Sequence, residues 1–396
     1  MNREDFLFLN QDIIYFDSAS TSLKPKILSE AISEYYNCYS TNIYRGEYDM
    51  SLHVNDLYEK TRIIVSEFIN ANKDEIIFTS GATDAINKIV LGYFEEYLTD
   101  GDEVLLTVSE HSSNILPWFE LSKRKNIVIN YIPLDENHKV TLDNVKSSIT
   151  KKTKVISIAH ITNVIGDIRP IKEITEIARE NNILVVCDGA QSVPHISTDV
   201  KNLDVEFLVF SSHKMCGPTG LGILYGKKEL LDKMKPIIVG GGMNSTMEKN
   251  GDITHSEIPR RFEAGTPNIS AIVSFSKIIE YLNNVGMNNI TKYVLELTEY
   301  AHNKFEKIDG ITIYNKHSEA GIITFNAHNI FAQDLAIYLN KHNICVRAGN
   351  HCAKLLKEEI GVKNTVRMSL YFYNTKEEID QLCELLKNKN IIDEII

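Results

Sequence analysis

The sequence has few cysteines, and none of them belongs to a metal or disulfide motif. Six cysteines lie among 396 residues, at positions 38, 187, 216, 345, 352 and 383, without a Cys-x-x-Cys pair. No spacing is typical of a zinc site, so we expect no metal. A disulfide framework is not expected in so long a chain without export signals. Cys187, in a predicted strand, and Cys383, in a helical pattern, should be inert apolar fillers.

Long apolar runs and basic blocks are missing as well. No apolar stretch is long enough to span a bilayer. Residues 1–6 carry acidic side chains and lack the apolar core of a signal or transit peptide, so we expect a cytoplasmic protein. The net charge is −11, and no basic cluster typical of a nucleic-acid-binding surface is present. Nucleic acids and membranes are therefore poor candidate partners.

The length and the hydrophobic patterns predict an α/β protein of two domains. A chain of 396 residues exceeds what one core usually serves. From about residue 55 to residue 230, helical patterns (57–68, 84–94) alternate with strand patterns (75–78, 103–108, 155–159, 183–187, 205–210). This alternation predicts a mostly parallel sheet.

The pattern changes after residues 265–267. A long helical stretch (270–305) precedes short strands (321–326, 345–347, 366–370) and a helix from residue 376, which predicts a smaller α+β domain. No repeat, low-complexity tract or Pro/Ser-rich linker occurs. We expect a large domain of residues 20–275, packed closely against a small domain of residues 1–19 and 276–396.

Two residues at predicted strand ends point to a cofactor. Asp188 ends the apolar run 183–187, and Lys214 follows the run 205–210. Ligands of open α/β sheets bind at the carboxyl ends of the strands. Pyridoxal phosphate requires a lysine that bonds to it covalently and a carboxylate that keeps its ring nitrogen protonated. Taken alone, each residue is more commonly an exposed lysine or a helix cap.

Two glycine-containing loops are candidate phosphate sites. Gly81 and Thr83 lie between a predicted strand and a predicted helix, where free helix amides and the Thr83 hydroxyl could hold a phosphate. An ordinary turn with Thr83 as the N-cap has the same pattern. Residues 217–222 fit neither the Rossmann nor the P-loop spacing. We interpret them as a tight turn and strand start beneath Lys214.

Taken together, several segments resemble a known family. They are residues 15–21, 44–46, 78–87, 110–118, 160–166, 188–191, 211–222, 262–268 and 346–353. The chain resembles the class V aminotransferase family of pyridoxal-phosphate enzymes and, within it, the SUF-type (group II) cysteine desulfurases. The resemblance implies the fold type I of these transferases. That fold has a mostly parallel seven-stranded sheet in the large domain, and the smaller domain carries the catalytic cysteine.

The resemblance also implies roles at the cofactor ring. Lys214 would carry pyridoxal phosphate and move the Cα proton of the substrate. Asp188 would pair with the ring nitrogen, and Gln191 would bond to the phenolate oxygen. His111 would stack on the ring and act as an acid or base near the substrate sulfur.

Further residues are implied to hold the phosphate. Thr83, Ser211 and His213 would bind it together with the backbone of Ala82. Thr266 would reach the phosphate in a partner subunit, which implies a homodimer with shared sites.

For the substrate, the resemblance implies a clamp and a nucleophile. Asn163, Arg347 and Arg367 would hold the carboxylate of L-cysteine. The Cys352 thiolate would attack the substrate sulfur, leaving L-alanine and a persulfide that supplies iron–sulfur cluster assembly, with a SufE- or SufU-type protein as the acceptor. The positive charges of His351, Arg347 and Lys354 could favour the Cys352 thiolate. Without the family match of the segment that contains it, Cys352 would be interpreted as a buried small residue.

Three positions depart from the family pattern, and other functions stay open. Ala82 stands where a second threonine is usual, Ser18 replaces an asparagine, and Asn350 replaces a histidine. These changes bear on cofactor affinity and sulfur transfer.

A selenocysteine lyase, a cysteine-sulfinate desulfinase or another class V aminotransferase would use the same cofactor residues. A non-catalytic pyridoxal-phosphate-binding or scaffold protein is the alternative outside enzymes.

Overall fold

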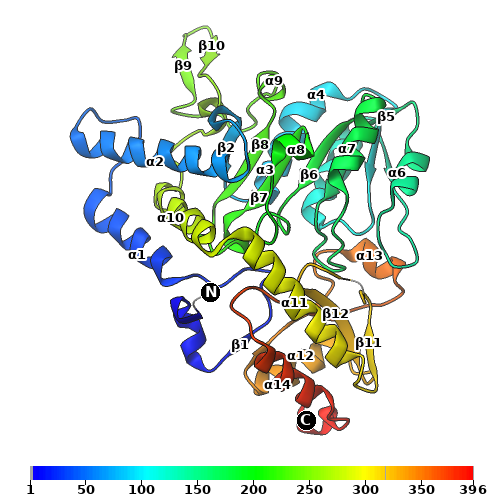
Figure 1. Ribbon diagram of the computed structural model, residues 1–396. Helices are drawn as coiled ribbons and strands as arrows, with labels where there is room; N and C mark the ends of the chain where they lie inside the picture. Colours follow the sequence, from blue (N-terminus) through cyan, green and yellow to red (C-terminus); the bar gives the residue numbers. More distant parts are fainter. Residues whose placement is uncertain (1–2, 317, 396) are drawn as a thin grey trace.

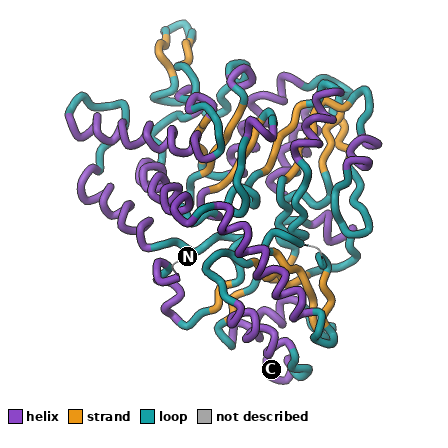
Figure 2. The backbone as a smooth tube through the Cα atoms, in the orientation of Figure 1, coloured by secondary structure: helices purple, strands orange, loops and turns teal. Residues whose placement is uncertain are grey.

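A seven-stranded sheet forms the centre of the protein, with helices on both faces (Figures 1 and 2). This computed structural model describes residues 3–316 and 318–395. The strand order is β2-β8-β7-β6-β5-β3-β4. The strands are β2 (Ile76–Thr79), β3 (Glu103–Leu106), β4 (Val128–Tyr131), β5 (Thr153–Ala159), β6 (Leu184–Asp188), β7 (Phe207–Ser211) and β8 (Gly222–Gly226).

Most of this sheet is parallel, which confirms the prediction. Strands β7, β6, β5, β3 and β4 run in one direction. Strand β8 is antiparallel to both of its neighbours, β7 and β2. The carboxyl ends of the parallel strands therefore meet at one edge of the sheet.

Strand β7 shows how the sheet is buried on both faces. All five of its residues are buried. Phe207 and Val209 pack into one hydrophobic core, whereas Leu208 and Phe210 pack into the other. Successive side chains of a strand point to opposite faces, so a strand covered on both sides is apolar throughout.

The helices of the large domain cover these two faces. Helices α1, α2, α7 and α10 contribute to one core, and helices α3 and α5 contribute to the other. The helices up to residue 285 are α1 (Lys26–Glu34), α2 (Asp49–Phe68), α3 (Ala82–Ile89), α4 (Glu95–Tyr97), α5 (Leu116–Arg124), α6 (Leu142–Ser148), α7 (Ile171–Glu180), α8 (Val200–Leu203), α9 (Lys228–Leu231) and α10 (Ile269–Val285).

The remaining chain forms a second α+β unit with its own core. A four-stranded antiparallel sheet has the order β11-β12-β15-β14, and β1 near the N-terminus pairs in parallel with β13. Its elements are β1 (Ile14–Tyr15), β11 (Ile311–Ile313), β12 (Ile322–Ala327), β13 (Ile344–Cys345), β14 (Arg347–Gly349), β15 (Thr365–Ser369), α11 (Met287–Phe305), α12 (Ala332–Lys341), α13 (Lys354–Glu359), α14 (Lys376–Leu386) and α15 (Ile391–Ile395).

Some element boundaries differ from the sequence prediction. The predicted helical stretch 270–305 is two helices, because Gly286 takes a φ of 85°, which ends α10 and begins α11. The predicted strand 345–347 is two short strands, β13 and β14, with different partners. Residue 275 lies inside α10, which packs on the large sheet, so the boundary at 275 stays a prediction.

A hairpin of β9 (Asn244–Met247) and β10 (Ile253–His255) projects from the large domain (Figure 1). The apolar side chains of Met247 and Ile253 on this hairpin are exposed. Among the described residues, no helix has the length and apolar character needed to cross a membrane.

A buried ion pair ties helix α2 to strand β2. Two guanidinium nitrogens of Arg62 each lie 2.8 Å from an oxygen of Glu263, and Arg62 also donates to the carbonyl of Ile76. Glu263 further accepts hydrogen bonds from the Phe78 amide and the Tyr58 hydroxyl. The two charged side chains are 1% and 6% exposed. Arg62 also pairs with the more exposed Glu59 of its own helix, so removing Glu263 would leave the buried guanidinium only partly compensated.

We expect Glu263→Ala to lower the free energy of unfolding by about 3 kcal/mol, because the buried Arg62 would keep only Glu59, whose side chain is 39% exposed, as a carboxylate partner. The double variant Arg62→Met/Glu263→Leu should recover most of this loss, because it removes both charges. Urea unfolding followed by circular dichroism measures both changes. A double variant as unstable as the single one would contradict the ion-pair explanation.

Candidate active site

A cavity of about 190 Å³ lies at the carboxyl edge of the parallel strands. It brings together all but two of the predicted site residues, although they are widely separated in the sequence. The predicted residues that line it are Ala82, Thr83, His111, Asn163, Asp188, Gln191, Ser211, His213, Lys214, Arg347 and Arg367. Thr266 and Cys352 lie outside its lining.

Asp188 ends strand β6, and Lys214 follows the neighbouring strand β7. One Asp188 oxygen accepts a hydrogen bond from the Ala190 amide at 2.9 Å. Burial raises the pKa of Asp188, although Lys214 acts in the opposite direction. Burial also lowers the pKa of Lys214 to about 8, despite the attraction of Asp188. Within the described chain the Lys214 amine makes no hydrogen bond, so it is available to a ligand.

The predicted phosphate residues surround the first turn of α3. The Ala82 amide donates to Ser211 Oγ at 2.8 Å, and the Thr83 and Ser113 hydroxyls lie 2.7 Å apart. All four residues line the cavity. The start of an α-helix presents free amides and partial positive charge, which suits a phosphate.

His111 is a neutral hydrogen-bonding group in this site. Its Nδ1 accepts a hydrogen bond from the Ser113 amide at 3.1 Å, so its proton lies on Nε2. Burial, followed by the charges of Lys214, Arg347 and Arg367, lowers the pKa of His111 to about 3. The His111 ring can therefore donate an N–H to a ligand at neutral pH without carrying a charge.

A buried ion pair beneath the cavity orders the loops that follow β3 and β5. Arg169 pairs with Glu110, and both side chains are fully buried. Arg169 also donates to the hydroxyls of Thr107 and Ser109. Glu110 accepts from the Ala159 amide at 2.8 Å. This network joins the loop that carries His111 to the end of β5, the strand that precedes the loop of Asn163.

Unused hydrogen-bonding groups in the wall show that pyridoxal phosphate fits. The side-chain oxygens of Gln191 and Asn163 are buried without a partner in the described chain. Their amide nitrogens donate to the carbonyls of Ala19 and His351, respectively. A free lysine amine, a buried carboxylate and a helix start lie around the same cavity, which matches the three groups that this cofactor presents. The residues that would hold it are Lys214, Asp188, Gln191, Thr83, Ser211 and His213.

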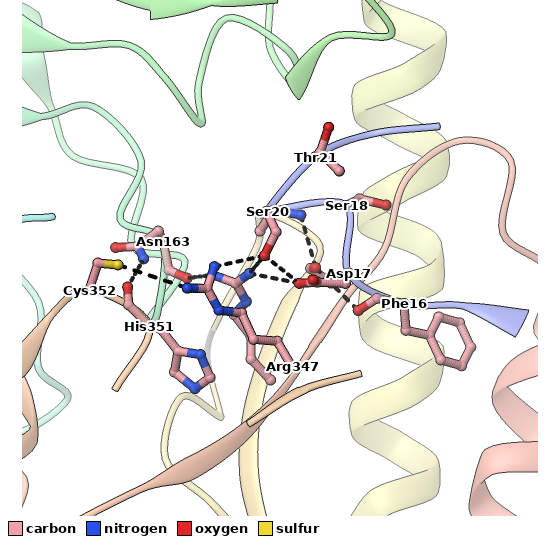
Figure 3. Close-up of polar contacts among 12 residues, drawn as sticks. Phe16, Asp17, Ser18, Ser20, Thr21, Asn163, Arg347, His351 and Cys352 are labelled. Carbon is pink, nitrogen blue, oxygen red and sulfur yellow. Dashed lines mark hydrogen bonds and ion pairs between the residues drawn. The ribbon is translucent and has the colours of Figure 1, made fainter. Parts of the chain in front are cut away.

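Two arginines of the small domain, Arg347 and Arg367, line the cavity, and Figure 3 shows Arg347 beside Ser20 and Asn163. Arg367 on β15 donates to Asp17 Oδ1 at 2.9 Å and to the Asn163 carbonyl at 3.0 Å. Both Arg347 and Arg367 also donate to the hydroxyl of Ser20. The arginines thus form a positively charged wall opposite Lys214, suited to a substrate carboxylate.

Cys352 lies beside this wall on an ordered loop. Its Sγ is 3.8 Å from Arg347 Nη2, and the residue is exposed. The Cys352 carbonyl accepts hydrogen bonds from the amide and the hydroxyl of Ser112, both at 2.7 Å. His351 and Cys352 have φ angles of 53° and 55°, an uncommon conformation outside glycine. These hydrogen bonds hold the loop in that conformation.

One sequence hypothesis about Cys352 is wrong. His351 does not supply positive charge, because burial and the charges of Arg367 and Lys357 lower its pKa to about 2. The His351 ring instead contacts the carbonyl and hydroxyl of Thr365. Arg347 is the cation that contacts the sulfur.

The sequence reasoning missed several residues of the site. Asp17, Ser20, Ser112 and Ser113 received no individual role. All four lie in segments 15–21 and 110–118, so the resemblance carried a signal for them. No strand pattern placed the N-terminal segment beside the arginines.

Comparisons with known proteins agree with this geometry. A family model described as aminotransferase class-V matches residues 14–382. The chain belongs to this family.

Curated relatives match this chain over most of its length. A probable cysteine desulfurase from Halalkalibacterium halodurans is 41% identical over 376 residues, covering 95% of this chain and 92% of that protein. A probable cysteine desulfurase from Staphylococcus aureus is 41% identical over 392 residues, covering 97% and 95%.

Solved structures show the same fold. The apo structure of a cysteine desulfurase from Thermococcus onnurineus has a TM-score of 0.94 and 34% identity, covering 97% of this chain and 96% of that chain. The cysteine desulfurase CsdA from Escherichia coli has a TM-score of 0.92 and 30% identity, covering 100% and 98%. Fold type I is thereby confirmed, while the SUF-type subgroup stays a prediction.

The pKa of Lys214 predicts a pH-dependent stability difference in the cofactor-free protein. Its pKa is about 8 in the folded protein, against 10.5 for an ordinary lysine. Burying the ammonium therefore destabilises the fold fully below about pH 8, and the cost disappears as the pH rises toward about 10.5. We expect cofactor-free Lys214→Met to be more stable than the parent at neutral pH, with a difference that shrinks as the pH rises.

Urea unfolding of both proteins across this pH range measures the difference in stability. The effects of groups that titrate in both proteins cancel in this difference. The matched control is Lys233→Met, which replaces an exposed lysine and should show no such trend. A stability difference for Lys214→Met that does not change with pH would contradict the prediction.

Proposed function

We propose that this protein is a pyridoxal-phosphate-dependent cysteine desulfurase that converts L-cysteine to L-alanine and places the sulfur on Cys352. The position of the exposed Cys352 thiol carries the proposal. Its Sγ lies 3.8 Å from an arginine that also lines the cavity of Lys214 and Asp188. A substrate held by its carboxylate at Arg347 would present its sulfur near Cys352. The relatives named cysteine desulfurase support this function.

Each group at the cavity has a task in this reaction. When bound, pyridoxal phosphate stabilises negative charge at the substrate Cα. The Lys214 amine moves the Cα proton, for which a pKa of about 8 is well suited. Arg347 and Arg367 hold the carboxylate, and Asn163 lies beside them. His111 donates its Nε2 proton within the cavity.

Sulfur transfer follows from the thiolate of Cys352. The thiolate attacks the substrate sulfur, an S–S bond forms, and the bond between the substrate sulfur and Cβ breaks. The electron pair of that bond stays with the carbon side, and Cβ gains a proton to become the methyl group of alanine. The product on the enzyme is a persulfide, so no external oxidant is required.

The proposal includes partners of the reaction. Cys352 is exposed, which supports sulfur transfer to an acceptor of the SufE or SufU type for iron–sulfur cluster assembly. Thr266 is exposed and bonded to Asn42 outside the cavity of its own chain, which supports a role at the phosphate of a partner subunit in a homodimer. We place the protein in the cytoplasm.

We expect Cys352→Ala to abolish the persulfide and to lower alanine formation from L-cysteine at least about 100-fold, because the nucleophile is lost. The protein is mixed with pyridoxal phosphate and L-cysteine. Mass spectrometry then reports the sulfur added to each cysteine. The parent protein should gain sulfur at Cys352. The control is Cys38→Ala, which removes the other exposed cysteine and should leave the activity unchanged.

The same experiment separates the alternatives. A Cys352→Ala protein that still releases sulfide from L-cysteine at the parent rate would contradict the persulfide mechanism. If that variant cleaves selenocysteine or cysteine sulfinate at the parent rate, the lyase or desulfinase function is favoured. A parent protein that binds the cofactor without forming alanine or persulfide would favour an aminotransferase or a non-catalytic binding protein.

A further inference from the structure

Two arginines of the substrate wall face each other across paired strands. Arg347 on β14 and Arg367 on β15 are direct partners in the antiparallel register. Like charges directly opposite each other on neighbouring strands destabilise a sheet. Both guanidinium groups nevertheless line the same cavity. Other groups of the fold must hold them together.

The hydroxyl of Ser20 joins the two guanidinium groups (Figure 3). Ser20 Oγ accepts from Arg347 Nη1 at 2.8 Å and from Arg367 Nη2 at 2.9 Å. It donates to Asp17 Oδ1 at 2.7 Å. A hydroxyl has one donor and two acceptor positions, so all of its capacity is used. These three bonds fix the position of the oxygen.

The two arginines depend on Ser20 to different degrees. Arg367 is also held by Asp17 and by the carbonyl of Asn163. Among the described residues, Ser20 Oγ is the only oxygen bonded to the guanidinium of Arg347, whose other polar contact is Cys352 Sγ. Loss of the hydroxyl would therefore leave Arg367 in place and release Arg347.

The charges of Asp17, Arg347 and Arg367 leave room for one anion. Asp17 pairs with Arg367, whereas no described carboxylate contacts Arg347. Apart from the Cys352 sulfur, Arg347 has no partner in the described chain that could carry a negative charge, so a single carboxylate can pair with it. A long arginine side chain loses rotamer entropy when it is fixed. A site that fixes it before the ligand arrives binds that ligand more tightly.

We propose that Ser20 is a positioning residue for the α-carboxylate of the substrate. Its hydroxyl holds Arg347 beside Arg367 in the orientation that binds this carboxylate, before the substrate arrives. The inference rests on the proposed function, because it takes an amino-acid carboxylate as the ligand of Arg347. Ser20 acts through the two arginines and neither accepts nor donates a proton in the reaction.

The first test compares steady-state constants for L-cysteine in the cofactor-loaded enzyme. Ser20→Ala should raise KM about tenfold and leave kcat within about twofold, because a charge-assisted hydrogen bond that orders the binding group is lost. Ser20→Thr keeps the hydroxyl and should restore KM. The control is Ser29→Ala, which removes an exposed hydroxyl of α1 that bonds to the carbonyl of Lys26 and contacts neither arginine. Its KM should match that of the parent protein.

The second test measures binding without turnover. Calorimetry reports the affinity of the cofactor-loaded protein for 3-mercaptopropionate, which has a thiol and a carboxylate but no amine. The comparison ligand is cysteamine, which has a thiol and an amine but no carboxylate. Ser20→Ala should weaken 3-mercaptopropionate about tenfold and leave cysteamine unchanged. If circular dichroism shows that Ser20→Ala is not folded, Ser20→Cys replaces it, because a thiol is a weak acceptor.

Several results would overturn the role of Ser20. These are an unchanged or lower KM in Ser20→Ala, a fall in kcat at constant KM, or an equal loss of affinity for both ligands. Failure of the proposed function looks different. The parent protein would then form no persulfide on Cys352, while Ser20→Ala would still weaken 3-mercaptopropionate selectively.

Discussion

The active site depends on one constraint, which is the burial of parallel strands on both faces. Strands β6 and β7 are apolar up to their last residues because helices cover them from both sides. Polar side chains are therefore concentrated at the ends of these strands. Because the strands are parallel, these ends meet at one edge, and Asp188, Lys214 and the loops of His111 and Asn163 converge there. The buried Glu110–Arg169 pair then fixes the loops relative to each other.

The electrostatics of the cavity follow from burial and from the sign of the charges. Arg347, Arg367 and Lys214 surround it, while His111 and His213 are neutral because burial lowers their pKa values. The carboxylates of Asp188 and Asp17 compensate only part of the positive charge. The wall that remains suits two anionic groups, a phosphate at the start of α3 and a carboxylate at the arginines. The arrangement thus favours an amino acid bound to a phosphorylated cofactor.

The small domain supplies what distinguishes this site from a general cofactor site. Strands β14 and β15 bring the two arginines to the cavity, and the chain then turns at His351 to present Cys352. Hydrogen bonds from Asn163 and Ser112 of the large domain hold this turn. The N-terminal segment contributes Asp17 and Ser20 to the same wall. The proposed substrate binding and sulfur transfer would therefore both require the two domains to stay closely packed.

Much of the fold could be predicted from local sequence patterns, whereas most residues of the site were predicted from the resemblance to the class V aminotransferase family. The alternation of helical and strand patterns predicted the mostly parallel sheet, and the ends of the apolar runs 183–187 and 205–210 pointed to Asp188 and Lys214. Gly286 shows where local pattern was insufficient: the helical periodicity continues through it, and only the backbone conformation divides α10 from α11.

Contacts between distant segments were decided by the tertiary structure alone. The sequence could place His351 near Cys352, but its neutral state depends on burial among Arg367 and Lys357. Ser20 and Arg347 are separated by most of the chain, so no local pattern relates them. By itself the sequence determined the strand ends and their chemistry, since hydrophobic periodicity is a property of neighbouring residues. Tertiary packing decided which charges are buried together, since desolvation depends on every segment that surrounds a group.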